Sequence, residues 1–178
     1  MSRTSRGLIH DRSCRAGCNA PETLNHVLQT CHRTHYVRIR CHDAVVACLV
    51  RGLEKRKYRV TREAEFCNDE GVGKPDLIAT KMGRSIVIDA EVVNDQTIVD
   101  RAHKRKAEYY SANTSLRRAI ATKCGTEVLQ FISATLSWRG LWSARTAKDL
   151  LKSGFINKSD LKVISSRVFA GGVAASLQ

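Results

Sequence analysis

The sequence has no long apolar run. Nowhere does it approach the roughly 20 consecutive apolar residues that a helix needs to span a bilayer, and no signal peptide is recognisable. Internal repeats and low-complexity tracts are also missing. We therefore expect an intracellular protein with no membrane partner. Its 178 residues are enough for one folded domain with a proper core, with or without a small fused module.

Acidic residues are scarce. The chain has 17 Asp and Glu against 30 Lys and Arg, which gives a formal net charge of +13. Residues 1–60 contain 12 basic and 4 acidic residues, whereas the rest of the chain contains 18 and 13. A surplus of this kind favours a polyanionic partner, so we expect nucleic-acid binding, mainly through the N-terminal third.

Disulfides are not expected either. The seven cysteines are an odd number, and without a secretory signal they favour a reducing compartment. Four soft ligands with the spacing Cys-x3-Cys-x7-His-x4-Cys lie within eighteen residues: Cys14, Cys18, His26 and Cys31. Thiolate and imidazole are the ligands that tetrahedral zinc prefers, so we predict a structural Zn²⁺ site. His32 or His35 stays open as an alternative to His26, because Cys31-x3-His35 is also finger-like spacing.

The central stretch predicts a hairpin that carries acids. Residues 73–79 and 85–93 are apolar runs of strand type, joined by a turn at residues 81–84. Asp76 opens the first run, and Asp89 and Glu91 lie on one face of the second because side chains alternate along a strand. Carboxylates in so apolar a strand need a cation, and Mg²⁺ or Mn²⁺ bound by Asp76 and Asp89 would supply one.

The remaining patterns predict an α/β protein. We expect strands at 58–66 and 127–137, a loop at 67–73, and fraying at 171–176. Helices are expected at 34–56, 98–122 with a break near 111–115, 143–151 and 159–169. The finger and this larger part give two domains: a zinc knuckle with a basic N-terminal arm in residues 1–34, and residues 35–178.

One helix places a lysine where a catalytic cation would be useful. At 100° per residue Lys106 falls on the inward stripe of the helix that begins near residue 98, while Lys104 lies opposite. A lysine among inward apolar residues either extends past them to solvent or reaches an anionic site. The two nearby carboxylates favour the second interpretation. The expected DNA contacts are other basic side chains: Arg38, Lys55, Arg56, Lys57, Lys74, Lys104 and Arg105.

The chain resembles one family in three features taken together. These are the finger spacing, Lys74-Pro75-Asp76 followed by Asp89 after twelve intervening residues, and the helix from Lys106 to Tyr109. The family comprises the C-terminal parts of site-specific non-LTR retrotransposons that insert into ribosomal RNA genes, where a zinc knuckle precedes a restriction-like endonuclease. The resemblance covers about Cys14 to Trp142.

The resemblance implies a fold and a role. The fold would be a PD-(D/E)xK core with a mixed central sheet flanked by helices, and it would nick double-stranded DNA for target-primed reverse transcription. The partners would be ribosomal RNA genes, the element RNA and an upstream reverse transcriptase, in the nucleus. Glu91 occupies the usual lysine position of the motif, so the catalytic lysine would be Lys106, with Glu91 and Tyr109 assisting.

Two other functions stay open. The chain could bind DNA through its knuckle while the nuclease fold only positions the duplex, if no lysine reaches the carboxylates. It could also be a junction-resolving nuclease, whose core pattern is similar.

Overall fold

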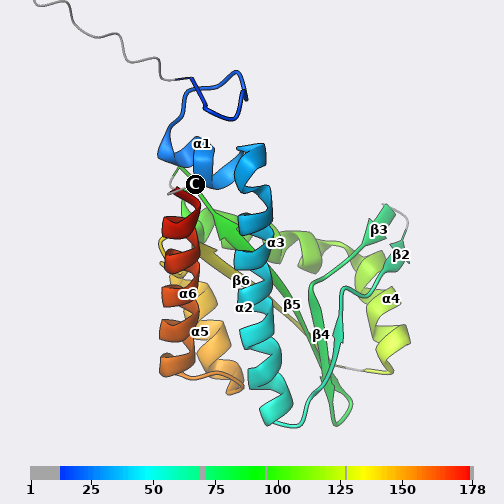
Figure 1. Cartoon of the computed structure of the whole chain (residues 1–178). Helices are drawn as coiled ribbons and strands as arrows, with labels where there is room; N and C mark the ends of the chain where they lie inside the picture. Colours follow the sequence, from blue (N-terminus) through cyan, green and yellow to red (C-terminus); the bar gives the residue numbers. More distant parts are fainter. Residues whose placement is uncertain (1–12, 69–70, 95, 127, 177–178) are drawn as a thin grey trace, which may run out of the picture.

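The computed structural model describes residues 13–68, 71–94, 96–126 and 128–176. Most of the expected basic N-terminal arm, residues 1–12, lies outside these ranges. The chain folds around a four-stranded sheet with helices on both faces (Figure 1). This confirms the expected α/β class with a mixed central sheet flanked by helices.

The sheet has the strand order β1-β4-β5-β6. Its strands are β1 (Arg59–Arg62), β4 (Leu77–Lys81), β5 (Arg84–Val93) and β6 (Val128–Ser137). The predicted hairpin is confirmed, because β4 and β5 are antiparallel and Lys81 pairs with Arg84 at the turn. Strand β6 pairs with β5 in parallel, and the intervening chain crosses the sheet as two helices.

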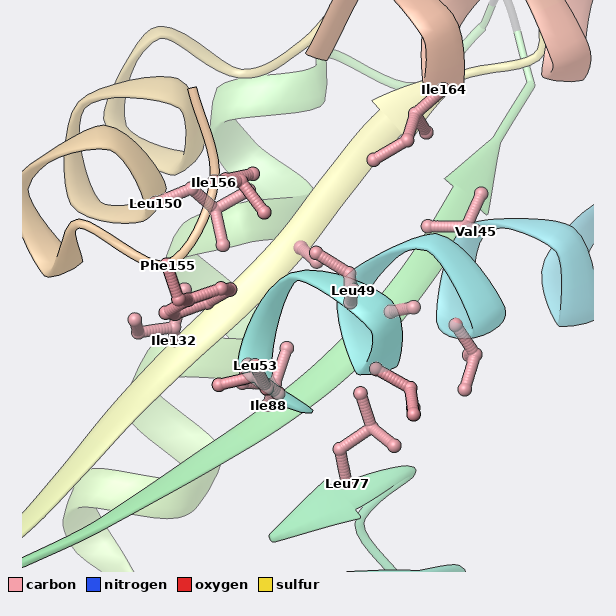
Figure 2. Close-up of a cluster of buried hydrophobic side chains, with 14 of the residues drawn as sticks. Val45, Leu49, Leu53, Leu77, Ile88, Ile132, Leu150, Phe155, Ile156 and Ile164 are labelled. Carbon is pink, nitrogen blue, oxygen red and sulfur yellow. The ribbon is translucent and has the colours of Figure 1, made fainter. Parts of the chain in front are cut away.

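Helices α2 (His35–Lys55), α5 (Ala144–Ser153) and α6 (Lys158–Ser176) cover one face of the sheet. Figure 2 shows Leu49 and Leu53 of α2 above β5, with Phe155 beside them. These three side chains are fully buried, so this side holds the larger core.

Helices α3 (Val99–Ala112) and α4 (Thr114–Cys124) cover the other face. The predicted break between them is confirmed: Asn113 caps α4 by accepting a hydrogen bond from the Leu116 N–H. Strand β5 alternates between the two cores, with Ile88 in the larger one and Val87 in the smaller one. Asp89 therefore lies on the Val87 side of the sheet, toward α3.

The single strand expected at 58–66 is wrong. The backbone ends β1 at Arg62, and Glu63 has a left-handed φ of 47°. Beyond it, β2 (Phe66–Asn68) pairs with β3 (Gly71–Gly73) in a separate two-stranded sheet, where a loop was expected. Periodicity along the sequence does not register such a turn, because the apolar alternation continues through it.

The predicted fraying of residues 171–176 is also wrong, because α6 continues to Ser176. Gly171 explains this: a Cβ atom there would lie 2.2 Å from Cys41 Sγ on α2. The missing side chain lets the two helices approach closely (Figure 1). Packing along α2 thus outweighs the low helix propensity of glycine.

The N-terminal module contains a short helix, α1 (Leu24–Gln29), and a 3-10 turn, η1 (His32–Thr34). It packs against the rest of the chain through Leu28, which contacts Trp138 and Val37. The Thr34 hydroxyl is buried and donates to the Val27 carbonyl, which ties the turn to α1. Within the described ranges, no helix is long and apolar enough to cross a membrane.

Candidate functional site

The four predicted zinc ligands converge. One ligand atom from each of Cys14, Cys18, His26 and Cys31 lies within 4.8 Å of the others. Cys31 Sγ is 3.7 Å from both Cys14 Sγ and Cys18 Sγ. A tetrahedral site with Zn–S bonds of about 2.3 Å requires S–S separations of about 3.8 Å. The thiols are therefore already spaced for zinc.

The structure also favours His26 as the fourth ligand. Its Nε2 atom is buried with no hydrogen-bond partner among the described residues, while Nδ1 is 2.9 Å from the Thr30 hydroxyl. That hydroxyl can fix the ring orientation and leave Nε2 for a metal. The alternative His32 instead places Nδ1 3.2 Å from Cys18 Sγ, as an outer partner of the thiolate. His35 contacts Arg38.

The Cys14 thiol is set up to ionise. Burial raises its pKa, but the Ala16 backbone N–H and the neighbouring His26, Cys18 and Cys31 side chains outweigh burial and lower the pKa to about 6. Because zinc binds the thiolate, this environment suits a metal ligand.

Asp76 lies one residue before β4 and is fixed by two donors. Its Oδ2 atom accepts a 2.7 Å hydrogen bond from the Ala90 backbone N–H of β5. The same oxygen is 3.3 Å from Nε2 of His42, which reaches it from α2. Asp76 thus ties the start of β4 to β5 and α2.

Asp89 is fixed in the same way from α3. Its Oδ2 accepts hydrogen bonds from Lys106 Nζ at 2.7 Å and from the Tyr110 hydroxyl at 2.9 Å. The Asp89 and Lys106 side chains are only 14% and 25% exposed, so solvent screens this pair weakly. The inward phase predicted for Lys106 corresponds to this contact.

The two carboxyl groups influence each other's protonation. Burial and the neighbouring Asp76 raise the pKa of Asp89 to about 6, against the opposing effect of Lys106. Burial also opposes ionisation of Asp76, but hydrogen bonds with His42 and Asp89 lower the pKa of Asp76 overall. Two close carboxylates shift each other's pKa in this way when no cation neutralises them.

The two carboxylates have the chemistry that a divalent cation needs. Oδ2 of Asp76 contacts His42 and the Ala90 N–H, and Oδ2 of Asp89 contacts Lys106 and Tyr110. Oxygen ligands from one or two carboxylates are what Mg²⁺ takes from proteins. Asp76 and Asp89 could therefore hold such a cation between them.

The other predicted catalytic side chains are placed differently. Glu91 accepts a 2.6 Å ion pair from Arg105 through Oε1, and its Oε2 is buried without a described partner. Tyr109 is 48% exposed, and it is the next residue, Tyr110, that reaches Asp89. Glu91 is thus paired with Arg105, and Tyr110 takes the contact with Asp89 that was expected of Tyr109.

The expected DNA contacts fall into three groups. Three of the side chains already pair with acids: Lys74 with Glu63 and Glu65, Lys104 with Glu108, and Arg105 with Glu91. Arg38 donates to the Cys31 carbonyl and the Thr34 hydroxyl, so it joins the knuckle to α2. The run Lys55, Arg56 and Lys57 lies at the far end of α2 from His42.

Two site residues escaped prediction, although each carried a signal. His42 was expected to be an ordinary surface or half-buried residue, yet it precedes the buried Val45, Val46 and Leu49 by three, four and seven positions. That spacing places it on the inward side of α2. Tyr109 and Tyr110 follow Lys106 by three and four positions, so helical spacing puts both near its face, and Tyr110 is the one that is buried against Asp89.

Comparison with known proteins finds similarity to retrotransposon polyproteins, and no protein-family model matches the chain. It is 41% identical over 181 residues to the retrovirus-related Pol polyprotein from type-2 retrotransposable element R2DM of Drosophila melanogaster. It is 38% identical over 159 residues to the corresponding polyprotein from type-1 element R2 of Nasonia vitripennis. These matches cover 99% and 89% of the chain, and 17% and 15% of the relatives. Its homologues are therefore R2 Pol polyproteins, of which it spans about a sixth.

A solved structure of a protein of unknown function, AF1548, aligns with 74% of the chain and 96% of its own length. The TM-score is 0.36 at 11% identity, which is too low to support a fold assignment.

Proposed function

We propose that this chain, whose homologues are R2 Pol polyproteins, is the DNA-nicking part of such a protein, with a restriction-like PD-(D/E)xK core dependent on Mg²⁺ or Mn²⁺. The observation that carries the proposal is the convergence of Asp76, Asp89 and Lys106 at one end of the sheet. Two neighbouring acids that can hold a cation, and an amine 2.7 Å from one of them, suit phosphodiester hydrolysis.

The chemistry divides between a cation and the side chains. A Mg²⁺ ion held by Asp76 and Asp89 would supply charge neutralisation at the phosphate and a more acidic water. Lys106 places a cation beside Asp89, where it can orient the attacking water and stabilise negative charge that develops on the phosphate. Lys106 thus fills the role that Glu91, in the usual lysine position of the motif, does not.

His42 and Tyr110 act on the carboxylates and not on the substrate. His42 and the Ala90 N–H hold Asp76, and Tyr110 with Lys106 holds Asp89. These contacts fix the orientation of both carboxylates. This preorganisation reduces the cost of assembling the site when DNA and metal bind.

The surroundings support a role in target-primed reverse transcription. The Cys14, Cys18, His26 and Cys31 cluster is spaced for zinc, and the folded knuckle it would stabilise packs directly on the nuclease part through Leu28 and Trp138. The net charge of +13 suits double-stranded DNA, with ribosomal RNA genes as the proposed target. We infer a nuclear location, with the reverse transcriptase and the element RNA as partners.

Nicking of supercoiled plasmid in Mg²⁺ tests this function. The wild type should convert supercoiled to open-circular DNA, and Asp76→Ala should not. Glu108→Ala is the matched control, because Glu108 is an exposed acid on α3 that contacts only Lys104 among the described groups. Equal nicking by wild type and Asp76→Ala would overturn the assignment.

A second substrate comparison separates the other two functions. Binding of duplex without any metal-dependent nicking would indicate a DNA-binding module with an inactive nuclease fold. Faster cleavage of a four-way junction than of a linear duplex of the same arms would indicate a junction-resolving nuclease.

A further inference from the structure

A group of basic side chains lies along the edge strand of the sheet, between the hairpin turn and the carboxylates. It consists of Lys55, Lys57, Arg59, Arg62, Lys81 and Arg84, which we call the β1 track. Five of the six are exposed, and Lys81 is half-buried against Tyr58. No acidic residue occurs in the two segments that supply them, residues 55–62 and 80–85.

The track leads from the hairpin turn to the catalytic acids. Strand β1 is the edge strand of the four-stranded sheet. Arg59 pairs with Thr80 near the turn, and Arg62 pairs with Leu77, the residue after Asp76. The end of α2 and the turn itself add Lys55 and Arg84, so three separate segments supply cations near this edge of the sheet.

These cations lack the partners that neutralise the others. Within the described ranges, none of the five exposed track residues forms an ion pair, whereas Lys74, Lys104, Arg105 and Lys106 all do. Charges on an edge strand also prevent unwanted strand pairing. That purpose concerns Arg59 and Arg62 only, and it does not account for the cations at the end of α2 and at the turn.

The length of the track sets how much ligand it can reach. Lys55 follows His42 by 13 residues on one helix, a distance of about 20 Å at about 1.5 Å per residue. Arg84 precedes Asp89 by five residues on one strand, a distance of about 17 Å. Phosphates on one DNA strand advance about 3.4 Å per base pair, so these spans correspond to about five or six base pairs.

We propose that the β1 track binds the phosphate backbone of the target duplex on one side of the nick, out to about six base pairs from the scissile bond. The inference rests on the proposed nuclease function, which supplies the nick as the reference point. It adds a polarity to the substrate: one flank of the duplex is gripped by the chain along β1, and the other flank is not.

Salt dependence of binding tests the track without any cleavage. Affinity for a 40-base-pair duplex would be measured between low and moderate salt, without Mg²⁺, for the zinc-loaded chain. Lys55→Gln/Arg59→Gln/Arg84→Gln should reduce the slope of log K against log salt by about 2.7, since each lost phosphate contact contributes about 0.9. The control Lys148→Gln/Lys152→Gln/Lys162→Gln removes the same charge from exposed positions on α5 and α6 and should leave the slope near that of the wild type.

Equal slopes for the two triple variants would overturn the track. Thermal unfolding of both variants keeps the comparison meaningful, because all six positions are exposed and should tolerate glutamine.

Trimming the duplex then tests the polarity. After the cut is mapped on the 40-base-pair duplex, each flank is shortened in turn to ten, six and three base pairs. Wild-type nicking should fall at least tenfold when one flank, and only that flank, drops from six to three, and the track variant should be insensitive to that change. A symmetric or absent length effect would overturn the proposal while nicking itself continues. If the full duplex shows no nicking that depends on Asp76, the proposed nuclease function fails. The salt slopes would still show whether the β1 track binds phosphates.

Discussion

Replacing His42 with alanine should weaken binding of the catalytic cation more than it weakens the fold. His42 Nε2 lies 3.3 Å from Asp76 Oδ2, and the Ala90 N–H would be the one donor left on that oxygen. Freed of one tether, the Asp76 carboxylate can rotate, and its metal-facing oxygen loses its fixed direction. Losing an outer partner of a metal ligand typically costs 10- to 100-fold in metal affinity or activity. We expect the Mg²⁺ concentration for half-maximal nicking to rise by about that factor.

The assay is a Mg²⁺ titration of plasmid nicking at saturating protein. His42→Gln should recover part of the loss, because its amide can still donate toward Asp76. Asp43→Ala is the control, since Asp43 is 65% exposed and lies 3.5 Å from the other ring nitrogen, Nδ1. An unchanged Mg²⁺ requirement in His42→Ala, with normal folding, would refute the tethering role. A loss that His42→Gln does not recover, together with reduced thermal stability, would assign His42 to packing only.

Other substitutions test the remaining contacts. Metal analysis should give about one zinc per wild-type chain, which Cys18→Ser should lose and His32→Ala should retain. Full zinc in Cys18→Ser would rule out this ligand set. Lys106→Met should slow nicking by about 10²- to 10³-fold even at saturating Mg²⁺, as loss of a charge-stabilising donor does; a wild-type rate would remove it from the mechanism. Gly171→Ala should destabilise the fold by about 1–3 kcal/mol in urea unfolding, because its Cβ would lie 2.2 Å from Cys41 Sγ. Adding Cys41→Ala should restore most of that loss, since 3.9 Å would then separate the two Cβ atoms, and strict additivity of the two changes would contradict the packing.

Local patterns were sufficient for much of the fold. Alternation along residues 85–93 and the turn at 81–84 predict the hairpin, and helical periodicity places Lys106 toward the carboxylates. Cysteine spacing predicts the cluster because its ligands lie within one short segment, where sequence distance limits spatial distance.

Contacts between distant elements were less accessible. His42 and Asp76 are 34 residues apart, and only the packing of α2 on the sheet brings them together. The turn at Glu63 and the extension of α6 past Gly171 likewise depend on tertiary contacts that override local preference. Tyr110 differs from Tyr109 by one position on a helix, which is finer than periodicity resolves.

Manganese binding is the most direct measurement of the central claim that Asp76 and Asp89 together hold a divalent cation. Free Mn²⁺ would be followed by electron paramagnetic resonance during titration of the zinc-loaded chain bound to duplex DNA. The wild type should bind Mn²⁺ at a site that Asp89→Asn loses and that Glu108→Ala retains. Equal Mn²⁺ uptake by the wild type and Asp89→Asn would contradict this claim.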